Sequence, residues 1–516
     1  MPNARPQGTE VLIVGAGPTG LVLAIWLARL GIRTRIVDRN AAPSTTSRAL
    51  GVQARVLEMY DQLGLAAPTV AGGVKAEALN LWVGGTRATR LPIAPIGRGM
   101  TPFPFVLIFP QDAHERLLID HLAMLGVLVE RSVTLAALTQ RADGVDATLT
   151  RADGSTESCA AQYVAGCDGA RSAVRQALDI GFPGATYSQY FYVADVQATG
   201  PTANGEVHVA LDDADFLIVF PMKGAGRVRL VGVARDKGGR SDADVRFADV
   251  SHLALEHLGV HVDSVNWFST YHVHHRVAAR FRDRRAFLLG DAAHIHSPVG
   301  GQGMNTGISD AINLGWKLAA AVRGRGSERL LDSYEPERIA FAQRLVATTD
   351  RMFTLATARG PVARFVRTRL APRIAPLAVR VPAVRRLMFR TVSQIWINYR
   401  RSALSGGTAG GVRGGDRLPW LPDVAGADNF APLASLTWQV HVYGEAPNAI
   451  ISACRELGIA LHCFPWTVHA ERAGLARAAL YLVRPDGYVG FADATCDVAA
   501  LRRYVADWGL ATTNGG

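Results

Sequence analysis

The stretch "GDAAHIHSPVGGQGMN", residues 290–305, brings together one acid, two histidines, a proline and four glycines. It follows the apolar run "AFLLG", which has the composition of a buried strand. Polar and glycine-rich residues at the end of such a strand indicate a binding site, with Asp291 as the first candidate. The alternative is that Asp291 only caps the next helix.

A second glycine-rich stretch, "GAGPTG", lies between an expected strand and an expected helix. Gly15 would make the tight turn, Gly17 would let the backbone approach a pyrophosphate, and Gly20 would pack the helix against the strand. The helix N-terminus would then face the phosphates. Asp38, at the end of the next expected strand, could accept hydrogen bonds from a ribose, which favours FAD or NAD over NADP. The predicted dinucleotide-binding set also includes Thr19 and Arg39.

The elements that must position these residues follow from periodicity. Residues 10–38 have the pattern of strand, turn, helix and strand, which predicts a βαβ unit and a parallel sheet. Residues 162–178 and 284–294 are expected to return to that sheet. Between them, short runs such as "EVHVAL" and "FLIVFPM" predict a largely antiparallel second sheet. Residues 309–402 have a helical pattern, and a glycine-rich linker precedes a small α/β domain.

The composition is that of a globular protein, with 49% hydrophobic and 19% charged residues among 516. No apolar run approaches the roughly 20 residues of a membrane span, and the first ten residues lack the apolar core of a signal peptide. We therefore expect a cytoplasmic protein. The cysteines form no CxxC pair, so we expect reduced, structural thiols. They are Cys159, Cys167, Cys454, Cys463 and Cys496.

The net charge of +11 is concentrated in one region. Eleven arginines and no acid lie between Ala356 and Arg401, spaced among apolar residues as on an amphipathic helix. We expect a solvated helical face without membrane contact; docking on a membrane or an acidic partner stays as the alternative. Because no nucleic-acid-binding motif accompanies the arginines, we expect no nucleic acid partner.

Three motifs together resemble a known family. "GAGPTG", "CDGARSAVR" and "GDAAHIHSPVGGQGMNTGISDAINLGWKLA" look like the three fingerprints of single-component FAD-dependent aromatic hydroxylases, the family of p-hydroxybenzoate hydroxylase and phenol hydroxylase. The resemblance covers roughly residues 9–402. The tail is similar to the thioredoxin-like domain of phenol hydroxylases and aromatic polyketide hydroxylases. Because the tail lacks a CxxC pair, we expect it to be structural.

The expected fold class is α/β with an α+β middle domain: a Rossmann-like FAD domain, an inserted antiparallel sheet domain, a helical connector and a thioredoxin-like C-terminal domain. The expected boundaries are 1–75, 100–180 and 284–350 for the FAD-binding domain, 76–99 and 181–283 for the substrate domain, 351–402 for the connector, 403–428 for a linker and 429–516 for the C-terminal domain. The linker predicts a separable C-terminal domain.

The resemblance also implies site residues. Asp291 would bind flavin ribityl hydroxyls, and Pro298, Gly300 and Gly301 would let the backbone run along the flavin ring. Arg48 would reach the pyrophosphate and NADPH, Gln111 would contact FAD, and Asp168 would lie near both cofactors; a surface arginine and a turn-forming acid remain the alternatives. The helix starting near Gly303, Met304 and Asn305 would point its positive end at the flavin. Asp38 stands where the family most often has glutamate.

The reaction implied is oxygen transfer from a flavin C4a-hydroperoxide to a small aromatic substrate, with NADPH or NADH and O2 consumed. No second GxGxxG follows a strand, so the nicotinamide cofactor would bind only transiently. Pocket candidates are Phe220, Met222, Trp82 and Phe103, and Tyr192, His208 and Tyr271 are unranked candidates for the base. Histidines 272, 274, 294 and 296 are expected to be structural, with no metal.

Baeyer–Villiger oxidation, epoxidation and a non-catalytic flavin-binding partner protein stay open as alternatives. The oligomeric state is also open, with a homodimer as one option.

Overall fold

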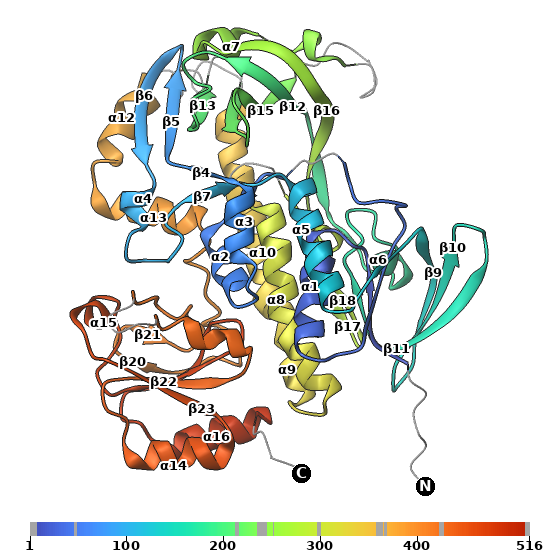
Figure 1. Ribbon diagram of the computed structural model, residues 1–516, viewed down its shortest axis with the longest axis vertical. Helices are drawn as coiled ribbons and strands as arrows, with labels where there is room; N and C mark the ends of the chain where they lie inside the picture. The colour runs from blue at the N-terminus through green and yellow to red at the C-terminus, as the bar shows by residue number, and fades with distance from the viewer. Residues whose placement is uncertain are drawn as a thin grey trace.

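The computed structural model describes residues 8–45, 49–211, 216–234, 245–250, 252–296, 301–357, 365, 369–422 and 428–510. Figure 1 shows two sheet-containing regions above and beside a central group of helices, with the C-terminal α/β unit packed below them. Among the described residues, we find no helix whose length and apolar content would let it cross a bilayer.

The first sheet contains the predicted βαβ unit. Its strands are β1 (Thr9–Val14), β2 (Thr34–Asp38), β8 (Val129–Arg131), β9 (Val133–Gln140), β10 (Val145–Arg151), β11 (Thr156–Gly166), β17 (Arg282–Asp283) and β18 (Ala286–Leu288). Strand β1 is parallel to β2 and β11, and β18 is parallel to β11. The order is β17-β18-β11-β1-β2-β8, and β9 and β10 extend β11 as antiparallel strands. This confirms that the three separated segments meet in one parallel core.

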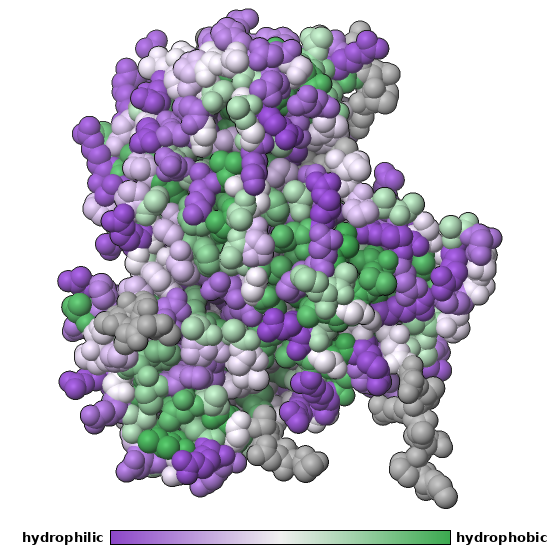
Figure 2. All heavy atoms as spheres, in the orientation of Figure 1, coloured by the Kyte–Doolittle hydropathy of each residue, from purple (hydrophilic) through white to green (hydrophobic). Residues whose placement is uncertain are grey.

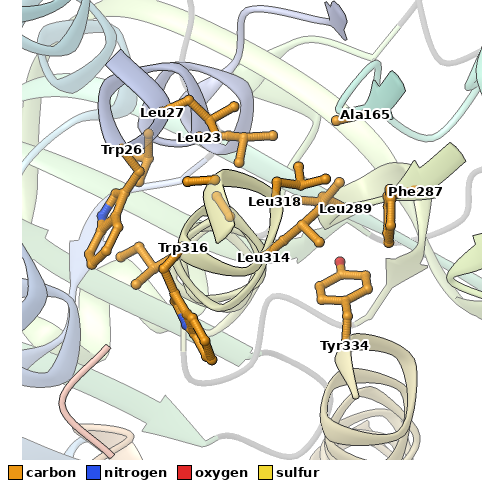
Figure 3. Packing of buried hydrophobic residues seen from close by; sticks show 14 of the residues in the cluster. Leu23, Trp26, Leu27, Ala165, Phe287, Leu289, Leu314, Trp316, Leu318 and Tyr334 are labelled. Carbon is orange, nitrogen blue, oxygen red and sulfur yellow. The ribbon is translucent and has the colours of Figure 1, made fainter. Parts of the chain in front are cut away.

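The helices of this part of the chain are α1 (Pro18–Arg29), α2 (Ala54–Asp61), α3 (Ala66–Gly72), α5 (Gln111–Met124), α6 (Ala173–Ala177), α8 (Gly303–Val322), α9 (Glu328–Asp332) and α10 (Tyr334–Thr357). Among them, α1 and α6 contact strands of this sheet, and α1 also packs on α5 and α8. Figure 3 shows Leu23 of α1 and Leu314 and Leu318 of α8 within one buried core. A Cβ at Gly315 would lie 3.1 Å from the Cβ of Trp26, so α1 and α8 pack closely at this glycine. The core therefore fixes α8 relative to the nucleotide-binding turn.

The second sheet is largely antiparallel, as expected. It contains β5 (Ala78–Val83), β6 (Thr86–Pro92), β12 (Gly184–Thr199), β13 (Val207–Leu211), β14 (Phe216–Pro221), β15 (Arg227–Ala234), β16 (His261–Val277) and β19 (His294–Ile295). The order is β19-β16-β12-β15-β14-β13-β5-β6, and β13 pairs with β5 in parallel. A smaller sheet, β3-β7-β4, lies between the two regions. Its strands are β3 (Gly51–Val52), β4 (Val74–Ala76) and β7 (Val106–Ile108).

The two faces of the second sheet carry different clusters, because successive side chains on a strand point to opposite sides. Tyr192, Leu217 and Val219 pack with helix α7 (Leu253–Leu258) on one face. Phe191, Ile218 and Phe220 belong to the other face. We call the first the α7 face and the second the open face, because several aromatic side chains on the second are only half-buried.

The helical connector contains α12 (Ala371–Ala378) and α13 (Pro382–Val392). Helix α12 contacts β6, and α13 packs on the short helix α4 (Ala94–Gly97). The face turned away from the protein is not purely polar, because large apolar side chains on both helices are exposed between the arginines. The exposed face of this region therefore mixes apolar side chains with arginines, and its role as a simple solvated face stays a prediction.

The C-terminal unit begins earlier than expected. Its strands are β20 (Gly406–Ala409), β21 (Val412–Arg413), β22 (Gln439–Tyr443), β23 (Ala460–Phe464), β24 (Leu480–Val483) and β25 (Val489–Asp493), with helices α14 (Asn448–Leu457), α15 (Val468–Arg472) and α16 (Val498–Trp508). Strand β20 pairs in parallel with β25, so residues 403–428 are not simply a linker. A Cβ at Gly407 would lie 2.0 Å from the carbonyl oxygen of Ala492. The glycines here permit close backbone packing rather than flexibility.

Candidate cofactor and substrate site

The three glycines after β1 have three different surroundings. Gly15 has φ +105°, and a Cβ there would lie 2.3 Å from the carbonyl oxygen of Cys167. A Cβ at Gly20 would lie 2.0 Å from the carbonyl oxygen of Gly15. A Cβ at Gly17 would meet nothing within 4 Å, and Gly17 is the N-cap of α1 without a side-chain cap. The N-terminus of α1 therefore has room for the predicted pyrophosphate, and the contact itself stays a prediction.

These surroundings predict opposite effects for two substitutions. Gly17→Val should leave the stability of the apoprotein within about 1 kcal/mol, because the site has space, but should weaken FAD binding at least about tenfold. Gly20→Ala should prevent correct folding, because the new methyl group would collide with backbone. Urea unfolding and FAD titration measure the two effects. Loss of folding in Gly17→Val, or normal FAD binding by it, would contradict this assignment.

Asp38 shapes the same turn. Its Oδ2 accepts a hydrogen bond from the amide of Ala16 at 2.7 Å, and its Oδ1 accepts one from the amide of Asn40 at 2.8 Å. A carboxylate has further lone pairs for a ribose hydroxyl. Arg131, which the sequence analysis missed, lies 3.8 Å from Asp38 Oδ1. Arg39 is exposed directly after the strand.

The side chain of Thr19 connects the first and third motifs. A Cβ at Gly290 would lie 2.7 Å from the Thr19 hydroxyl oxygen, and a Cβ at Gly307 would lie 2.4 Å from it. Thr19 therefore fills the space between two glycines. This contact gives it a packing role besides the cofactor contact that the sequence predicts.

Asp168 is partly used by the protein and partly unsatisfied. Its Oδ2 accepts hydrogen bonds from the amides of Ala173 at 2.6 Å and Val174 at 3.2 Å, at the start of α6. Its Oδ1 is buried without a hydrogen-bond partner among the described residues. Burial raises the pKa of this carboxyl. Both observations fit a group that receives a hydrogen bond from a bound ligand.

The second motif is tied to the third by a residue that the sequence analysis missed. Arg175 donates to the carbonyl oxygen of Ala292 at 2.9 Å and to that of Ala170 at 2.8 Å. Asp291 lies in the short 3-10 turn Gly290–Ala292 directly after β18, and its side chain is exposed while Gly290 and Ala292 are buried. This turn therefore presents Asp291 at the surface of the site, where the resemblance predicts a ribityl contact.

The N-terminus of α8 is joined to the segment around Gln53. Asn305 Oδ1 accepts from the amide of Gln53 at 2.8 Å, and Asn305 Nδ2 donates to the carbonyl oxygens of Gly51 at 2.8 Å and Gly301 at 2.9 Å. Gly301 has φ +60°. The N-cap Gln302 makes no side-chain cap, so nothing shown in the described part of the chain keeps a ligand from the positive end of this 20-residue helix.

Of the other site residues predicted near α8 or for the pyrophosphate, some lie among the described residues and some do not. Gly303 begins the helix, with its Cβ position 3.5 Å from His296 Nε2, and Met304 packs partly buried against the core. Pro298, Gly300 and Arg48 lie outside the described residues.

Gln111 begins α5 after β7. Its Nε2 donates to Glu115 Oε1 at 2.7 Å, along its own helix, and its amide donates to the carbonyl oxygen of Ala49 at 3.2 Å. The backbone of Gln111 thus lies next to the segment that precedes Gly51. Its role toward a cofactor stays a prediction.

A buried ion network behind α8 was not predicted. Asp310 Oδ2 accepts from the amide of Gly290 at 3.0 Å and lies 2.7 Å from His294 Nε2, and Asp310 Oδ1 accepts from Arg338 Nε at 2.5 Å. Although burial alone would raise it, the pKa of Asp310 is lowered, chiefly by the charge of Arg338. Asp310 is the acid in the stretch "GISDAINL" of the third motif, but the sequence alone could not show which charged side chains it contacts.

A second buried network joins α8 and α10 to the C-terminal unit. Glu337 accepts from Lys317 Nζ at 2.8 Å and from Arg484 Nη1 at 2.9 Å, and Arg484 Nη2 donates to Asp486 Oδ2 at 2.6 Å. Burial lowers the pKa of Lys317 to about 8 despite the nearby charge of Glu337. Trp316 donates to Asp486 at 3.2 Å. The C-terminal unit is therefore anchored in the helices that form the site.

The predicted pocket residues do not lie on one face. Phe220 and Phe103 pack in one cluster with Leu50 and Ala54, which flank the segment bonded to Asn305. Trp82 instead lies on the α7 face, where its indole donates to His208 Nδ1 at 3.1 Å. Placing Trp82 in a pocket with Phe220 is therefore wrong, because the sheet separates their side chains. Met222 is buried in the turn after β14 and stays a prediction.

The candidate bases are also separated by the sheet. Tyr192 and His208 lie on the α7 side: Tyr192 packs in that cluster, and His208 bonds to Trp82 and, through Nε2, to Asn204 at 3.0 Å. Burial lowers the pKa of His208 to about 4, which agrees with the neutral form that accepts from Trp82. Tyr271 lies on the open face, next to Phe191.

One ion pair lies among the aromatic residues of the open face. Arg229 donates from Nε to Asp195 Oδ1 at 2.5 Å and from Nη2 to Asp195 Oδ2 at 2.7 Å. Its guanidinium lies 5.6 Å from the ring centroid of Trp267. The open face therefore combines aromatic surface with one fixed, polar pair.

The described part of the chain gives little support for metal binding by histidines or for redox chemistry by cysteines. No group of three or more His, Cys, Asp and Glu side chains there is arranged to hold a metal ion. The cysteines are free thiols, and burial raises the pKa of Cys454 and of Cys496 to about 11.

Comparisons with known proteins agree with this geometry. Residues 8–349 match the family described as FAD binding domain. The chain is 38% identical over 413 residues to 6-methylpretetramide 4-monooxygenase of Streptomyces rimosus, covering 79% of this chain and 73% of the relative.

Solved structures are similar along almost the whole chain. The anhydrotetracycline hydroxylase OxyS of Streptomyces rimosus superposes with a TM-score of 0.79 at 30% identity, covering 98% of this chain and 99% of OxyS. A Diels-Alderase, PyrE3 of pyrroindomycin biosynthesis, gives a TM-score of 0.77 at 27% identity, with 98% and 100% covered. With the family match and the nucleotide-binding geometry, these findings show that the chain belongs to the FAD-dependent aromatic monooxygenases, the family that its three motifs resemble.

Proposed function

We propose that this enzyme hydroxylates a polycyclic phenolic substrate bound against the open face of the second sheet. The observation that carries the proposal is the cluster that joins Phe220 and Phe103 to Leu50 and Ala54, next to the N-terminus of α8. A flat aromatic ligand on this face would lie between aromatic side chains and the expected flavin position. The relatives named for tetracycline-type substrates support the same substrate class.

Bound FAD, reduced by NADPH or NADH, supplies the activation of O2 and the transfer of one oxygen atom to the ring. The residues of this chain fit FAD: Gly17 leaves space at the N-terminus of α1, Asp38 can accept from a ribose, and Asp168 Oδ1 has no hydrogen-bond partner within the described ranges. The positive end of α8 would stabilise negative charge that develops on the reduced ring. The apolar cluster around Phe220 would keep water away from the reacting atoms.

Tyr271 and the Arg229–Asp195 pair are the polar groups that we assign to the substrate. Tyr271 shares the open face with Phe220, so its hydroxyl is our candidate for accepting a hydrogen bond from the phenol and relaying its proton to bulk water. The ion pair would orient a hydroxyl or keto oxygen of the substrate. We further propose that the C-terminal unit is a thioredoxin-like domain with a structural role, because burial disfavours the reactive thiolate at two of its three cysteines, Cys454 and Cys496.

Two alternatives differ in product. Baeyer–Villiger oxidation or epoxidation would use the same cofactor geometry. The likeness to a Diels-Alderase adds a non-oxidative possibility, in which FAD would only complete the fold of the pocket. We place the enzyme in the cytoplasm, where NADPH and NADH are available.

The test is stopped-flow reduction of the holoenzyme. Because no second nucleotide-binding motif provides a permanent nicotinamide site, we expect slow NADPH oxidation alone and at least tenfold faster oxidation with a fused-ring phenol. Mass spectrometry should show a product with one added oxygen. Equal rates with and without the phenol would contradict the expected dependence of flavin reduction on substrate. A ring-expanded lactone would favour Baeyer–Villiger oxidation, and turnover without NADPH would favour the non-oxidative alternative.

A further inference from the structure

The helical connector carries most of the large hydrophobic side chains that the described chain exposes. Of the 14 large hydrophobic side chains that are exposed, eight lie within one stretch of 28 residues. They are Phe365, Leu370, Ile374, Leu377, Val381, Leu387, Met388 and Val392. A concentration of this kind marks an interaction surface rather than ordinary scatter.

The same stretch is strongly basic. Its described arginines are Arg369, Arg373, Arg380, Arg385, Arg386 and Arg390, and all except the half-buried Arg385 are exposed. No acid occurs in the sequence between Ala356 and Arg401. Strand β6, which contacts α12, adds the exposed Arg87 and Arg90, although Arg90 is paired with Glu206. Figure 2 shows hydrophilic side chains along the upper left edge, where α12 lies, with hydrophobic ones among them.

This surface is the outer side of a wall of the proposed substrate site. Phe389 is the buried residue of α13; a Cβ at Gly97 of α4 would lie 2.4 Å from its ring. Phe389 and Ile395 belong to the same cluster as Phe220 and Phe103. A partner on the outer surface of α13 would therefore be separated by one layer of side chains from the cluster that contains Phe220 and Phe103.

We propose that α12 and α13 dock on the surface of an anionic lipid bilayer. The apolar side chains would enter the boundary between headgroups and acyl chains, and the arginines would pair with lipid phosphates. Neither helix is long enough to cross the bilayer, so the contact is peripheral. The suggestion that docking delivers an apolar substrate to the site rests on the proposed function; the docking itself does not.

The charge pattern favours a lipid surface over two other occupants. A second copy of the chain would bring a second set of arginines against the first with no acid to pair them. An acidic protein would satisfy the arginines, but the exposed leucines and methionine alternate with them along both helices. A fluid interface accepts such an intermixed surface without a shaped complement.

Vesicle co-sedimentation of the holoenzyme tests the proposal. We expect binding to vesicles of phosphatidylglycerol and phosphatidylcholine at least tenfold tighter than to phosphatidylcholine alone, weakened by salt. The double variant Arg386→Gln, Arg390→Gln should lose at least tenfold in this affinity, and Leu387→Ser, Met388→Ser should weaken it as well. The matched control Arg116→Gln, Arg141→Gln changes net charge equally on two exposed arginines of α5 and the β9–β10 turn and should bind like the parent.

Absence of preference for anionic vesicles, or equal loss in the control, would overturn the proposal. So would self-association in light scattering that the connector variants abolish. Retained FAD and unchanged unfolding show that the variants are folded. The two proposals can fail separately: vesicle binding without product refutes the hydroxylase proposal alone, and hydroxylation without vesicle binding refutes the docking alone.

Discussion

Arg484→Met is expected to destabilise the folded chain by about 3–5 kcal/mol. Arg484 is fully buried and pairs with both Glu337 and Asp486. Methionine fills similar space but leaves two carboxylates buried near each other, with Lys317 as the remaining close cation for Glu337. Urea unfolding followed by tryptophan fluorescence measures the loss, and FAD release should accompany it because Glu337 also bonds to Asn313 of α8.

The matched control is Arg502→Met in the same unit. Arg502 pairs with Glu456, but both side chains are more than half exposed. Its loss should therefore cost less than about 1 kcal/mol. Similar small effects for both variants would show that the buried network adds little.

The same network corrects the expectation of a separable C-terminal domain. Arg484 lies in the β24–β25 hairpin, yet it bonds to Glu337 of α10. Arg55 of α2 donates to the carbonyl oxygen of Asp486 at 2.6 Å. Removing the unit would expose Trp316 and leave the buried carboxylate of Glu337 without Arg484. We therefore expect deletion from residue 403 onward to abolish folding rather than to release an independent FAD protein.

The nucleotide-binding turn could be predicted from the local sequence, because each of its glycines is needed for a reason set by its near neighbours in the chain. Gly15 needs a positive φ, Gly20 needs contact with backbone, and Gly17 needs open space. Each requirement is met within one βαβ unit, whose strand and helix periods are readable in 30 residues. The return of β11 and β18 to the sheet was also predictable, because their motifs must end at the same edge.

The predictions that were wrong depended on contacts between residues that lie far apart in the sequence. The glycine-rich stretch around Gly407 resembles a flexible linker, since sequence does not reveal that Ala492 of β25 packs directly against it. Trp82 and Phe220 belong to separate segments, and alternation within each strand cannot show which faces coincide. The ion networks join residues as distant as Glu337 and Arg484, so their partners are set only by the tertiary fold.

Asp310→Asn should have the largest effect on the site itself. Asp310 fixes Gly290, directly before Asp291, and it also meets His294 and Arg338. Asparagine keeps the shape but removes the charge, which leaves the guanidinium of Arg338 buried without its carboxylate. We expect a loss of about 3–5 kcal/mol in unfolding free energy at pH 7 and at least tenfold weaker FAD binding.

The dependence on pH follows from the lowered pKa of Asp310. A carboxyl whose pKa is lower in the folded than in the unfolded state stabilises the fold fully above the unfolded value of about 3.9. This stabilisation is lost as pH falls through the folded value, so the difference between parent and Asp310→Asn should shrink below about pH 4. The control Asp112→Asn removes a carboxylate whose partner Arg116 is exposed, and should cost less than about 1 kcal/mol. A difference between parent and Asp310→Asn that does not change between pH 7 and pH 3 would mean that the shape of Asp310, not its charge, positions the turn that carries Asp291.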